Sequence, residues 1–428
     1  MKFDTILIGG GMSALVCGIR LQKAGRKCLM VSAGQNALHF SSGAFGLLGR
    51  LSDGTPVTEP LKVLFSLPEN HPYSKIDTDK LTEYVAAVPA FFKECGIDLH
   101  QVSPSDASRS EVGEAIVRNG YRMTPMGTLK PAWLAMKDMT LLESKDQMPG
   151  SKALIVNFAG FLDFNTRFIA EGLERRGTSC RIEVVKLNDV ENIRKNPTEM
   201  RSVNIARVMT REENWKEFGH KVGGLVKDED LVILPEVFGL VNDEITGWLR
   251  EMIPAKVMFI GTMPPSVPGI RAQMLLKKAF EAAGGTFLMG DTAVDPVIED
   301  GMVKSIKTQN LGEIRLEADN FVLASGNLFG KGLEATPDKV TEPVFGLDVD
   351  FPEGRKDWCD EDFFAPQNFS GFGVVTDNKF RAVKGGETLG NLFVAGSEVG
   401  GCNSLQEGSG AGVAILTAMS VADNILAL

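Results

Sequence analysis

Residues 3–31 read FDTILIGGGMSALVCGIRLQKAGRKCLMV, and this stretch decides the fold. Its first six residues form a short apolar run, which is typical of a buried strand, and three glycines end that run. Leu15 and Ile19 then lie four residues apart, as on one face of a helix, and Gly25 favours the end of that helix before a second apolar run. The stretch therefore predicts a parallel βαβ unit.

The glycine turn matches the pattern G-x-G-x-x-A. Gly9 permits a tight bend, Gly11 leaves room for a phosphate group against the backbone, and Ala14 lets helix and strand approach closely. The amides of the first helical turn, together with the positive end of the helix dipole, would face that phosphate. Between a strand and a helix, the pattern predicts a nucleotide site.

The second strand ends at Ser32, and no acidic residue follows before Asp53. Dinucleotide sites usually carry Asp or Glu at this point, where it binds the adenosine ribose. Either the adenosine half is bound in another way, or the cofactor is a mononucleotide such as FMN. A second glycine pattern after a strand is missing, which argues against NAD(P)H as a donor on the same chain. Electrons should come from a substrate or a protein partner.

The last segment also predicts cofactor contacts. Residues 391–401, NLFVAGSEVGG, form another strand that ends in glycine, and further glycines lead into a helix over 411–428. Such a helix start can stabilise the negative charge that a reduced flavin develops at its N1 and O2 edge. The strand before residues 324–326 and the loop 39–44 are also expected near the flavin. The predicted cofactor-binding residues are Gly9, Gly11, Ala14, Ser32, Ser41, Ser42, Gly43, Ser325, Gly326, Gly396, Ser397, Glu398, Gly400, Gly401, Gly410 and Gly412.

Composition narrows the function classes. The 428 residues are 43% hydrophobic and 23% charged with a net charge of −10, which predicts a folded chain and argues against nucleic-acid binding. The six cysteines are widely spaced, so we expect no metal site and a cytoplasmic location. Nothing in the sequence resembles a signal peptide or a membrane-spanning helix.

These patterns predict an α/β, Rossmann-like flavoprotein with a βαβ nucleotide site and an inserted cap. The flavin-binding domain is expected to be discontinuous, over residues 1–65, 270–340 and 365–428. Residues 66–269, with 341–364, are expected to form a cap that binds substrate or contacts another protein of the same complex.

Several longer motifs carry a resemblance to a known family. They are FDTILIGGG, ALHFSSGAFGLL, HPYS, TPMGTL, VNIAR, EENW, PPSVPGIR, GLDV, DFFAPQ, FGVVTD and LFVAGSEVGG. The chain resembles flavoproteins of the fumarate-reductase type and, more closely and over nearly its whole length, the B subunits of anaerobic glycerol-3-phosphate dehydrogenases. Members of the wider group often carry an acidic residue directly after the glycine that matches Gly396, where this chain has Ser397 and then Glu398.

The resemblance implies a flavin-binding protein, with FMN as the expected cofactor and FAD as the alternative. It implies two partners in the same complex: an FAD-containing A subunit, and an iron–sulfur C subunit that would hold the pair at the inner membrane. The implied reaction is oxidation of sn-glycerol 3-phosphate to dihydroxyacetone phosphate, with electrons passed to quinone and then to fumarate or nitrate.

The substrate chemistry suggests catalytic candidates. A phosphate requires Arg or Lys, and oxidation of the secondary alcohol requires a base for the hydroxyl proton. Arg207 and Arg271 close two of the motifs, and His39 adjoins the predicted flavin loop. We expect Arg271 to bind phosphate and His39 to act as the base. Two alternatives remain: a non-catalytic flavin relay, and a related flavoenzyme for another small acid or alcohol.

Overall fold

The computed structural model describes residues 1–102, 117–241 and 243–428. They form two compact units, which are described separately below. The first unit contains Met1–Ala37, Gly46–Gly96 and Leu275–Leu428, and the second contains Leu38–Phe45 and Ile97–Met274.

This division differs in places from the predicted boundaries. Residues 66–96 and 341–364, which were predicted to belong to the cap, lie in the first unit. Residues 38–45 lie in the second unit, where strand β3 (Ala44–Phe45) pairs with β7 (Leu134–Met136). Residues 103–116 and 242 of the predicted cap lie outside the described residues.

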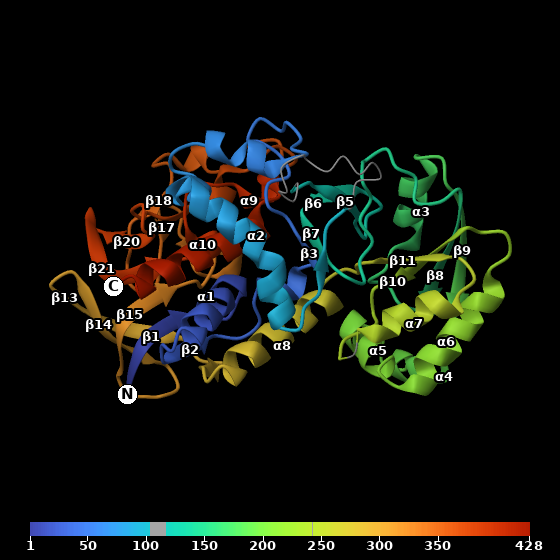
Figure 1. Cartoon of the computed structure of the whole chain (residues 1–428), viewed down its shortest axis with the longest axis horizontal. Coiled ribbons are helices and arrows are strands. Elements are labelled where there is room, and N and C mark those ends of the chain that lie inside the picture. Colours follow the sequence, from blue (N-terminus) through green and yellow to red (C-terminus); the bar gives the residue numbers. More distant parts are fainter. Residues whose placement is uncertain (103–116, 242) are drawn as a thin grey trace. The chain divides into compact units, whose positions relative to one another are not determined.

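The first unit is built on an eight-stranded sheet (Figure 1). Strand β1 (Lys2–Ile8) pairs in parallel with β2 (Cys28–Ser32) and with β15 (Leu316–Leu323), and β21 (Glu387–Val394) pairs in parallel with the end of β15. Helix α1 (Met12–Lys23) connects β1 and β2, so the predicted βαβ unit is confirmed. The remaining strands of the sheet are β12 (Thr286–Met289), β13 (Ala293–Glu299), β14 (Met302–Thr308) and β20 (Arg381–Lys384).

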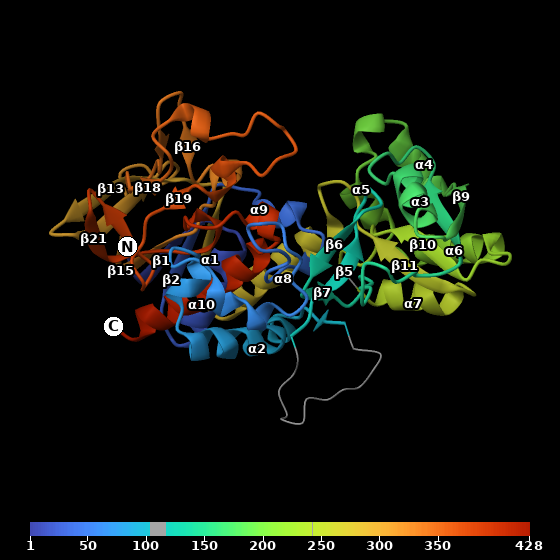
Figure 2. The ribbon, with the colours of Figure 1, turned by 90° about the horizontal axis from the view of Figure 1, so that it is seen from above.

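Helix α10 (Gly410–Leu426) packs against α1, and α2 (Thr78–Glu94) packs against α10 (Figures 1 and 2). The half-buried Asp423 side chain links all three helices, because it pairs with Arg20 of α1 and accepts a 2.8 Å hydrogen bond from Tyr84 of α2. The two ends of the chain therefore meet in one unit.

The second unit contains a four-stranded, fully parallel sheet in the order β11-β10-β8-β9. The strands are β8 (Lys152–Phe158), β9 (Ser179–Val185), β10 (Leu231–Pro235) and β11 (Lys256–Ile260). Strand order reverses between β8 and β10, as in doubly wound folds. Helix α3 (Thr166–Glu174) covers one face, whereas α6 (Glu212–Leu225) and α7 (Glu244–Met252) cover the other (Figures 1 and 2).

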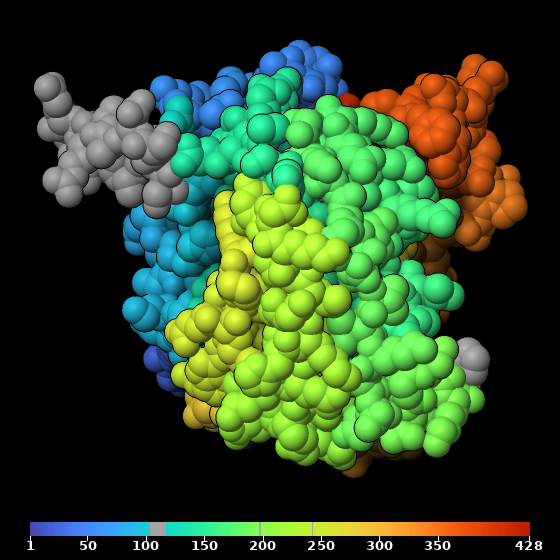
Figure 3. Space-filling model, turned by 90° about the vertical axis from the view of Figure 1, so that its right-hand side faces the viewer, coloured from blue at the N-terminus to red at the C-terminus, as the bar shows by residue number. Residues whose placement is uncertain are grey.

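A buried apolar core fills the space between this sheet and its helices. Phe158 of β8 and Phe218 of α6 stack with ring centroids 4.8 Å apart, and both are fully buried. Residues of this unit, coloured green to yellow, form much of the face shown in Figure 3.

The other elements of the second unit are β4 (Leu99–His100), β5 (Gly120–Met123), β6 (Leu129–Ala132), α4 (Asn188–Arg194) and α5 (Ser202–Val208), and α8 (Val267–Ala282) runs from this unit into the first. The first unit also contains β16 (Glu334–Ala335), β17 (Val340–Thr341), β18 (Val349–Asp350), β19 (Gly373–Val374) and α9 (Ser404–Glu407). Within the described ranges, no helix is long and apolar enough to cross a membrane.

Candidate functional site

The glycine turn after β1 is packed tightly against the end of β15. Gly9 has φ +120°, and a Cβ atom there would lie 2.1 Å from the carbonyl oxygen of Ala324. Only glycine fits this combination of backbone conformation and space. Ala14, the third position of the pattern, is fully buried in α1.

Gly11 differs from Gly9, because it has space around it. It precedes the first residue of α1 in an extended conformation, and no described side chain caps that end of the helix. A Cβ atom at Gly11 would come no closer than 4.0 Å to a described atom outside its immediate neighbours, and that atom is Asn36 Cβ. The open first turn leaves backbone amides available, so the geometry fits a phosphate group.

The chain after β2 supplies polar groups but no carboxylate. Ser32 is buried, and its hydroxyl donates to the carbonyl oxygen of Gly34. Asn36 donates from its side-chain amide to the carbonyl oxygen of Gly10 at 2.6 Å. Sequence reasoning missed Asn36, although an amide side chain soon after the second strand was a usable signal.

The carboxyl end of β21 approaches α1 closely. Gly396 has φ +81°, and a Cβ atom there would lie 2.1 Å from the hydroxyl oxygen of Ser13. The amide of Gly396 also donates to the Thr417 hydroxyl of α10 at 2.8 Å. The turn after β21 is thus fixed between the first and last long helices of the unit.

Glu398 joins this turn to the end of β15. Its carboxylate accepts hydrogen bonds from the Ser325 amide at 2.7 Å, from the Ser325 hydroxyl and from the Gly326 amide at 3.1 Å. Burial and the charge of Glu342 raise the pKa of Glu398 well above its usual value, although these hydrogen bonds oppose the shift. The Ser397 hydroxyl lies beside Gly326. The predicted residues 325, 326, 397 and 398 are therefore brought together.

The start of α10 is less open than that of α1, because the Gly412 amide in its first turn donates to the carbonyl oxygen of Gly46 at 2.8 Å. Ser409 precedes the helix, and within the described residues its first turn has no side-chain cap. A Cβ atom at Gly410 would lie 3.7 Å from Ser404, whereas one at Gly412 would overlap the Tyr73 hydroxyl and approach Leu47.

Gly400 and Gly401 lie in the segment after β21, where they contact neighbouring backbone. The Gly400 amide donates to the carbonyl oxygen of Val374 at 3.2 Å, and Gly401 adopts a positive φ beside the backbone of Asn70. In the structure, both glycines therefore serve close backbone packing.

Ser41, Ser42 and Gly43 belong to the second unit. The Ser41 and Ser42 hydroxyls accept the amides of Gly43 and Ala44 at 3.4 Å. The carbonyl oxygen of Gly43 accepts the amide of Met136 at 2.8 Å. These bonds hold the loop against β7.

The three predicted catalytic residues also lie in the second unit, in different surroundings. His39 is half-buried, and its Nε2 contacts Gln273 of α8, whereas its buried Nδ1 has no hydrogen-bond partner among the described residues. Arg271 is 3% exposed and pairs with the Asp138 carboxylate, while its other terminal nitrogen donates to the carbonyl oxygen of Gly239 at 2.7 Å.

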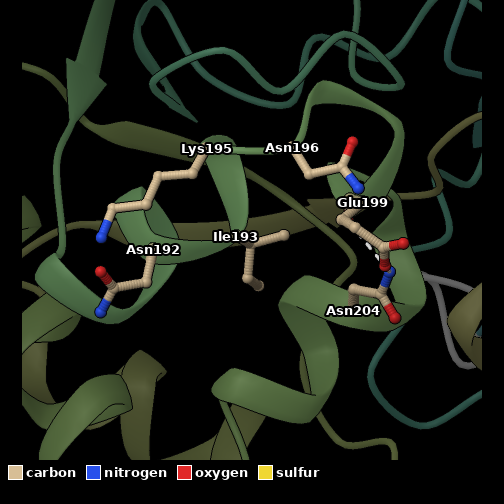
Figure 4. A pocket seen from close by; sticks show the side chains of 6 residues that line it. All are labelled: Asn192, Ile193, Lys195, Asn196, Glu199 and Asn204. Carbon is tan, nitrogen blue, oxygen red and sulfur yellow. Dashed lines mark hydrogen bonds between the residues drawn. The ribbon is translucent and has the colours of Figure 1, made fainter.

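Arg207 lies on the surface of α5 and donates to Asn204 at 3.1 Å. Asn204 is one wall of an open hollow of about 410 Å³, shown in Figure 4. The dashed line there marks the bond from Asn204 to Glu199, so these polar side chains already satisfy each other. Lys195 and Asn192 extend to the other side of the hollow (Figure 4). The side chains do not converge on a common point.

His71, Cys402 and Glu407 form a cluster whose potential ligand atoms lie within 4.8 Å of one another. His71 Nδ1 accepts the amide of Tyr73 at 3.1 Å, which leaves the proton of a neutral ring on Nε2, facing Glu407 at 3.2 Å. A metal ion at Nε2 would require the opposite tautomer, with Nδ1 as the donor. The cluster is therefore a hydrogen-bonded pair of imidazole and carboxylate.

Sequence reasoning missed a second buried charged group, at the carboxyl end of β10. Glu236 follows the apolar strand directly and is 0% exposed. Burial and the charge of Asp138 raise the pKa of its carboxyl group, whereas the charges of Arg122 and Arg250 lower it. An acidic residue immediately after a buried strand was the available signal.

Comparisons with known proteins give matches over most or all of the chain. A family model described as an FAD binding domain matches residues 4–413. The B subunit of an anaerobic glycerol-3-phosphate dehydrogenase from Yersinia pseudotuberculosis serotype I is 37% identical over 100% of this chain and 98% of its own. The protein of the same name from Pectobacterium carotovorum subsp. carotovorum is 38% identical over 100% and 99%.

Among solved structures, a 3-ketosteroid Δ1-dehydrogenase from Sterolibacterium denitrificans aligns with 100% of this chain and 99% of its own, at a TM-score of 0.42 and 10% identity. The family model supports a flavin cofactor and names FAD in particular, whereas FMN has no specific support. The resemblance stated from the sequence motifs is confirmed, and the chain belongs to the FAD binding domain family and, within it, to the B subunits of anaerobic glycerol-3-phosphate dehydrogenases.

Proposed function

We propose that the chain is the flavin-binding B subunit of an anaerobic glycerol-3-phosphate dehydrogenase, which oxidises sn-glycerol 3-phosphate to dihydroxyacetone phosphate. Its electrons would pass to quinone, and onward to fumarate or nitrate. The names of the full-length relatives support the substrate. Their designation as subunits supports an assembly, which we propose to contain an FAD-bearing A subunit and an iron–sulfur C subunit at the inner membrane.

One observation carries this proposal: the first unit presents two helix starts, of α1 and α10, that no described side chain caps. Amides at the start of α1 would bind a cofactor phosphate. Those of Gly410 and Ala411, at the start of α10, would stabilise negative charge at the flavin ring. When bound, a flavin supplies the acceptor for the hydride that leaves the alcohol carbon.

The chain's own residues would handle the substrate proton. His39 is suited to accept the hydroxyl proton, because its Nδ1 has no partner within the described part of the chain and Gln273 fixes the ring through Nε2. Arg271 could bind the substrate phosphate only together with Asp138, to which it is already paired.

A non-catalytic electron relay is the second candidate. The surroundings of the arginines favour it, since Arg271 is committed to Asp138 and Arg207 lies exposed on α5. In that case a partner protein would oxidise the substrate. A related flavoenzyme for another small acid or alcohol would instead respond to a different substrate in a panel.

Anaerobic addition of sn-glycerol 3-phosphate to the isolated, flavin-loaded chain separates these candidates. We expect the flavin absorbance to bleach. If the absorbance stays unchanged with substrate alone and falls only after the partner protein is added, the result would support the relay. The mass of the chromophore released from fresh protein identifies the flavin, and we expect the mass of FAD. The mass of FMN would instead agree with the missing acidic residue after the strand that ends at Ser32.

A further inference from the structure

A buried carboxylate lies at the carboxyl end of β10 in the second unit. Glu236 follows β10, its side chain is 0% exposed, and neither carboxylate oxygen has a hydrogen-bond partner among the described residues. Buried polar groups of this kind are rare, and each requires a reason such as a missing water, ion or ligand.

The neighbouring ion pair is also incomplete. Asp138 is 0% exposed, and one of its oxygens pairs with Arg271. Its other oxygen and the Arg271 Nε are both buried without a partner in the described part of the chain. The same cluster therefore contains acceptors that need donors and a donor that needs an acceptor.

Further charged groups face Glu236 from other elements. Arg122 of β5, Arg250 of α7 and Arg271 of α8 lower its pKa, whereas burial and Asp138 raise it, and the net shift is well upward. Burial lowers the pKa of Arg122, and the Glu236 charge opposes that shift. His100 of β4 lies near Asp138 and Arg250, and burial lowers its pKa too. We call these six residues the Glu236 cluster.

The position of the cluster is one that ligands favour. In doubly wound sheets, ligands bind at the carboxyl ends of the strands where strand order reverses, which here is between β8 and β10. Glu236 stands directly at the end of β10. Next to it, the ideal Cβ position of Gly261, just after β11, lies 4.0 Å from a Glu236 oxygen and 3.8 Å from Ser42 Cβ.

A purely structural ion pair would not leave these atoms unsatisfied. The free oxygens of Glu236 and Asp138 require hydroxyl donors, whereas Arg122 and the Arg271 Nε suit an anionic group. One small molecule supplies both only if it carries hydroxyl groups together with a phosphate or carboxylate.

We propose that the Glu236 cluster is the binding site for a small hydroxylated anion, in which Glu236 recognises a hydroxyl group and Arg122 the anionic group. This deepens the proposed function and rests on it, because sn-glycerol 3-phosphate belongs to that class. Glu236 is neutral when the site is filled, since an ionised carboxylate would repel the anion.

Binding is therefore linked to the proton on Glu236. Affinity decreases as the pH rises through the range in which Glu236 ionises, because removing the proton places a negative charge beside the anion. Titrations between about pH 7 and pH 9 keep the ligand phosphate dianionic, since its second pKa is about 6.

The test is calorimetric titration of the full chain with sn-glycerol 3-phosphate, with glycerol and inorganic phosphate as half-ligands. The variants are Glu236→Gln, which keeps the shape without the charge, and Arg122→Met. Glu199→Gln, in the open hollow of the same unit, is the matched control. We expect about tenfold or greater weakening in Arg122→Met, loss of the pH dependence in Glu236→Gln, and no change in Glu199→Gln.

The outcomes separate this inference from the proposed function. If glycerol 3-phosphate bleaches the flavin but both cluster variants bind it with the affinity and pH profile of the unchanged chain, the inference fails and the function stands. Glycerol 3-phosphate could also fail both to bind and to bleach the flavin. In that case, binding of a hydroxy acid such as glycerate, abolished by Arg122→Met, would support the binding site but not the proposed function. Failure of both ligand types to bind overturns the site.

Discussion

The carboxylate of Glu398 accepts the backbone amide of Ser325 at 2.7 Å and thereby joins the turn after β21 to the end of β15. The same carboxylate accepts the amide of Gly326. The ends of two adjacent parallel strands are thus held by one side chain, at the edge of the sheet where several cofactor-binding residues were predicted.

Glu398→Ala should destabilise the chain strongly. The substitution leaves the Ser325 and Gly326 amides without their acceptor, and each such loss costs about 1–3 kcal/mol. Urea unfolding should show a loss of more than about 3 kcal/mol. The loss should be smaller for Glu398→Gln, whose side-chain carbonyl retains an acceptor for the two amides that share one carboxylate oxygen. Glu387→Gln, at the exposed start of β21, is the control. A loss for Glu398→Ala as small as that of the control would show that Glu398 does not hold the two strand ends together.

Gly9→Ala should be far more damaging than Gly25→Ala. Both positions have positive φ, but a Cβ atom at Gly25 meets nothing within 4 Å, whereas one at Gly9 would overlap the Ala324 carbonyl. The unfavourable backbone conformation alone costs about 1–2 kcal/mol, so thermal or urea unfolding should show a loss of that order at Gly25 and a several-fold greater one at Gly9. Equal losses would mean that β1 and β15 do not approach as described.

Gly11→Ala tests the phosphate site itself. Because space surrounds Gly11, the variant should fold with a loss below about 1 kcal/mol. The added methyl group would occupy the space over the open first turn of α1, so flavin affinity should fall about tenfold or more. Fluorescence titration of the apoprotein measures this, with Gly25→Ala as the control. Unchanged affinity would place the cofactor phosphate elsewhere.

Much of the first unit could be predicted from local pattern. The run from Phe3 to Val31 contains a strand, a glycine turn, a helix and a second strand in immediate succession, and their pairing is parallel as expected. The strand that ends at Gly396 and the helix that follows were equally local signals. These strands and helices pack together in one unit because each buries an apolar face, and the spacing of apolar residues in the sequence indicates that face well.

The surroundings of the proposed catalytic residues could not be predicted in the same way. The burial of Arg271 depends on Asp138, which lies 133 residues away in the sequence, and no local pattern encodes that pairing. Glu236 draws its environment from β5, α7, α8 and the segment after β7, so its significance appears only once these elements are assembled. Glu398 could be assigned to the turn after β21, but its acceptance of the Ser325 amide required the register between β15 and β21.

Asp423→Asn should loosen the three-helix contact. Asp423 pairs with Arg20 and accepts a hydrogen bond from the Tyr84 hydroxyl, and the Arg20 guanidinium also lies over the Tyr84 ring. The amide retains an acceptor for Tyr84 but removes the charge partner of Arg20, so we expect a loss of about 1–2 kcal/mol in urea unfolding. High salt should narrow the difference from the unchanged chain, because it weakens the ion pair that only the latter contains. A difference independent of salt would assign the effect to packing.

The pair of His71 and Glu407 should make stability depend on acid pH. Burial acts to raise the pKa of Glu407, but hydrogen bonds from His71 and Ser409, together with the positive charge of a protonated His71, outweigh it and hold the pKa below its usual value. A carboxyl group with a lowered folded-state pKa contributes stability above its unfolded value of about 4.3. That contribution is lost as the pH falls through the folded-state pKa. Urea unfolding at stepped pH should therefore show a steeper decline below about pH 5 in the unchanged chain than in Glu407→Gln. Glu387→Gln should keep the full slope, and equal slopes in all three proteins would show that Glu407 is not held in its ionised form by these bonds.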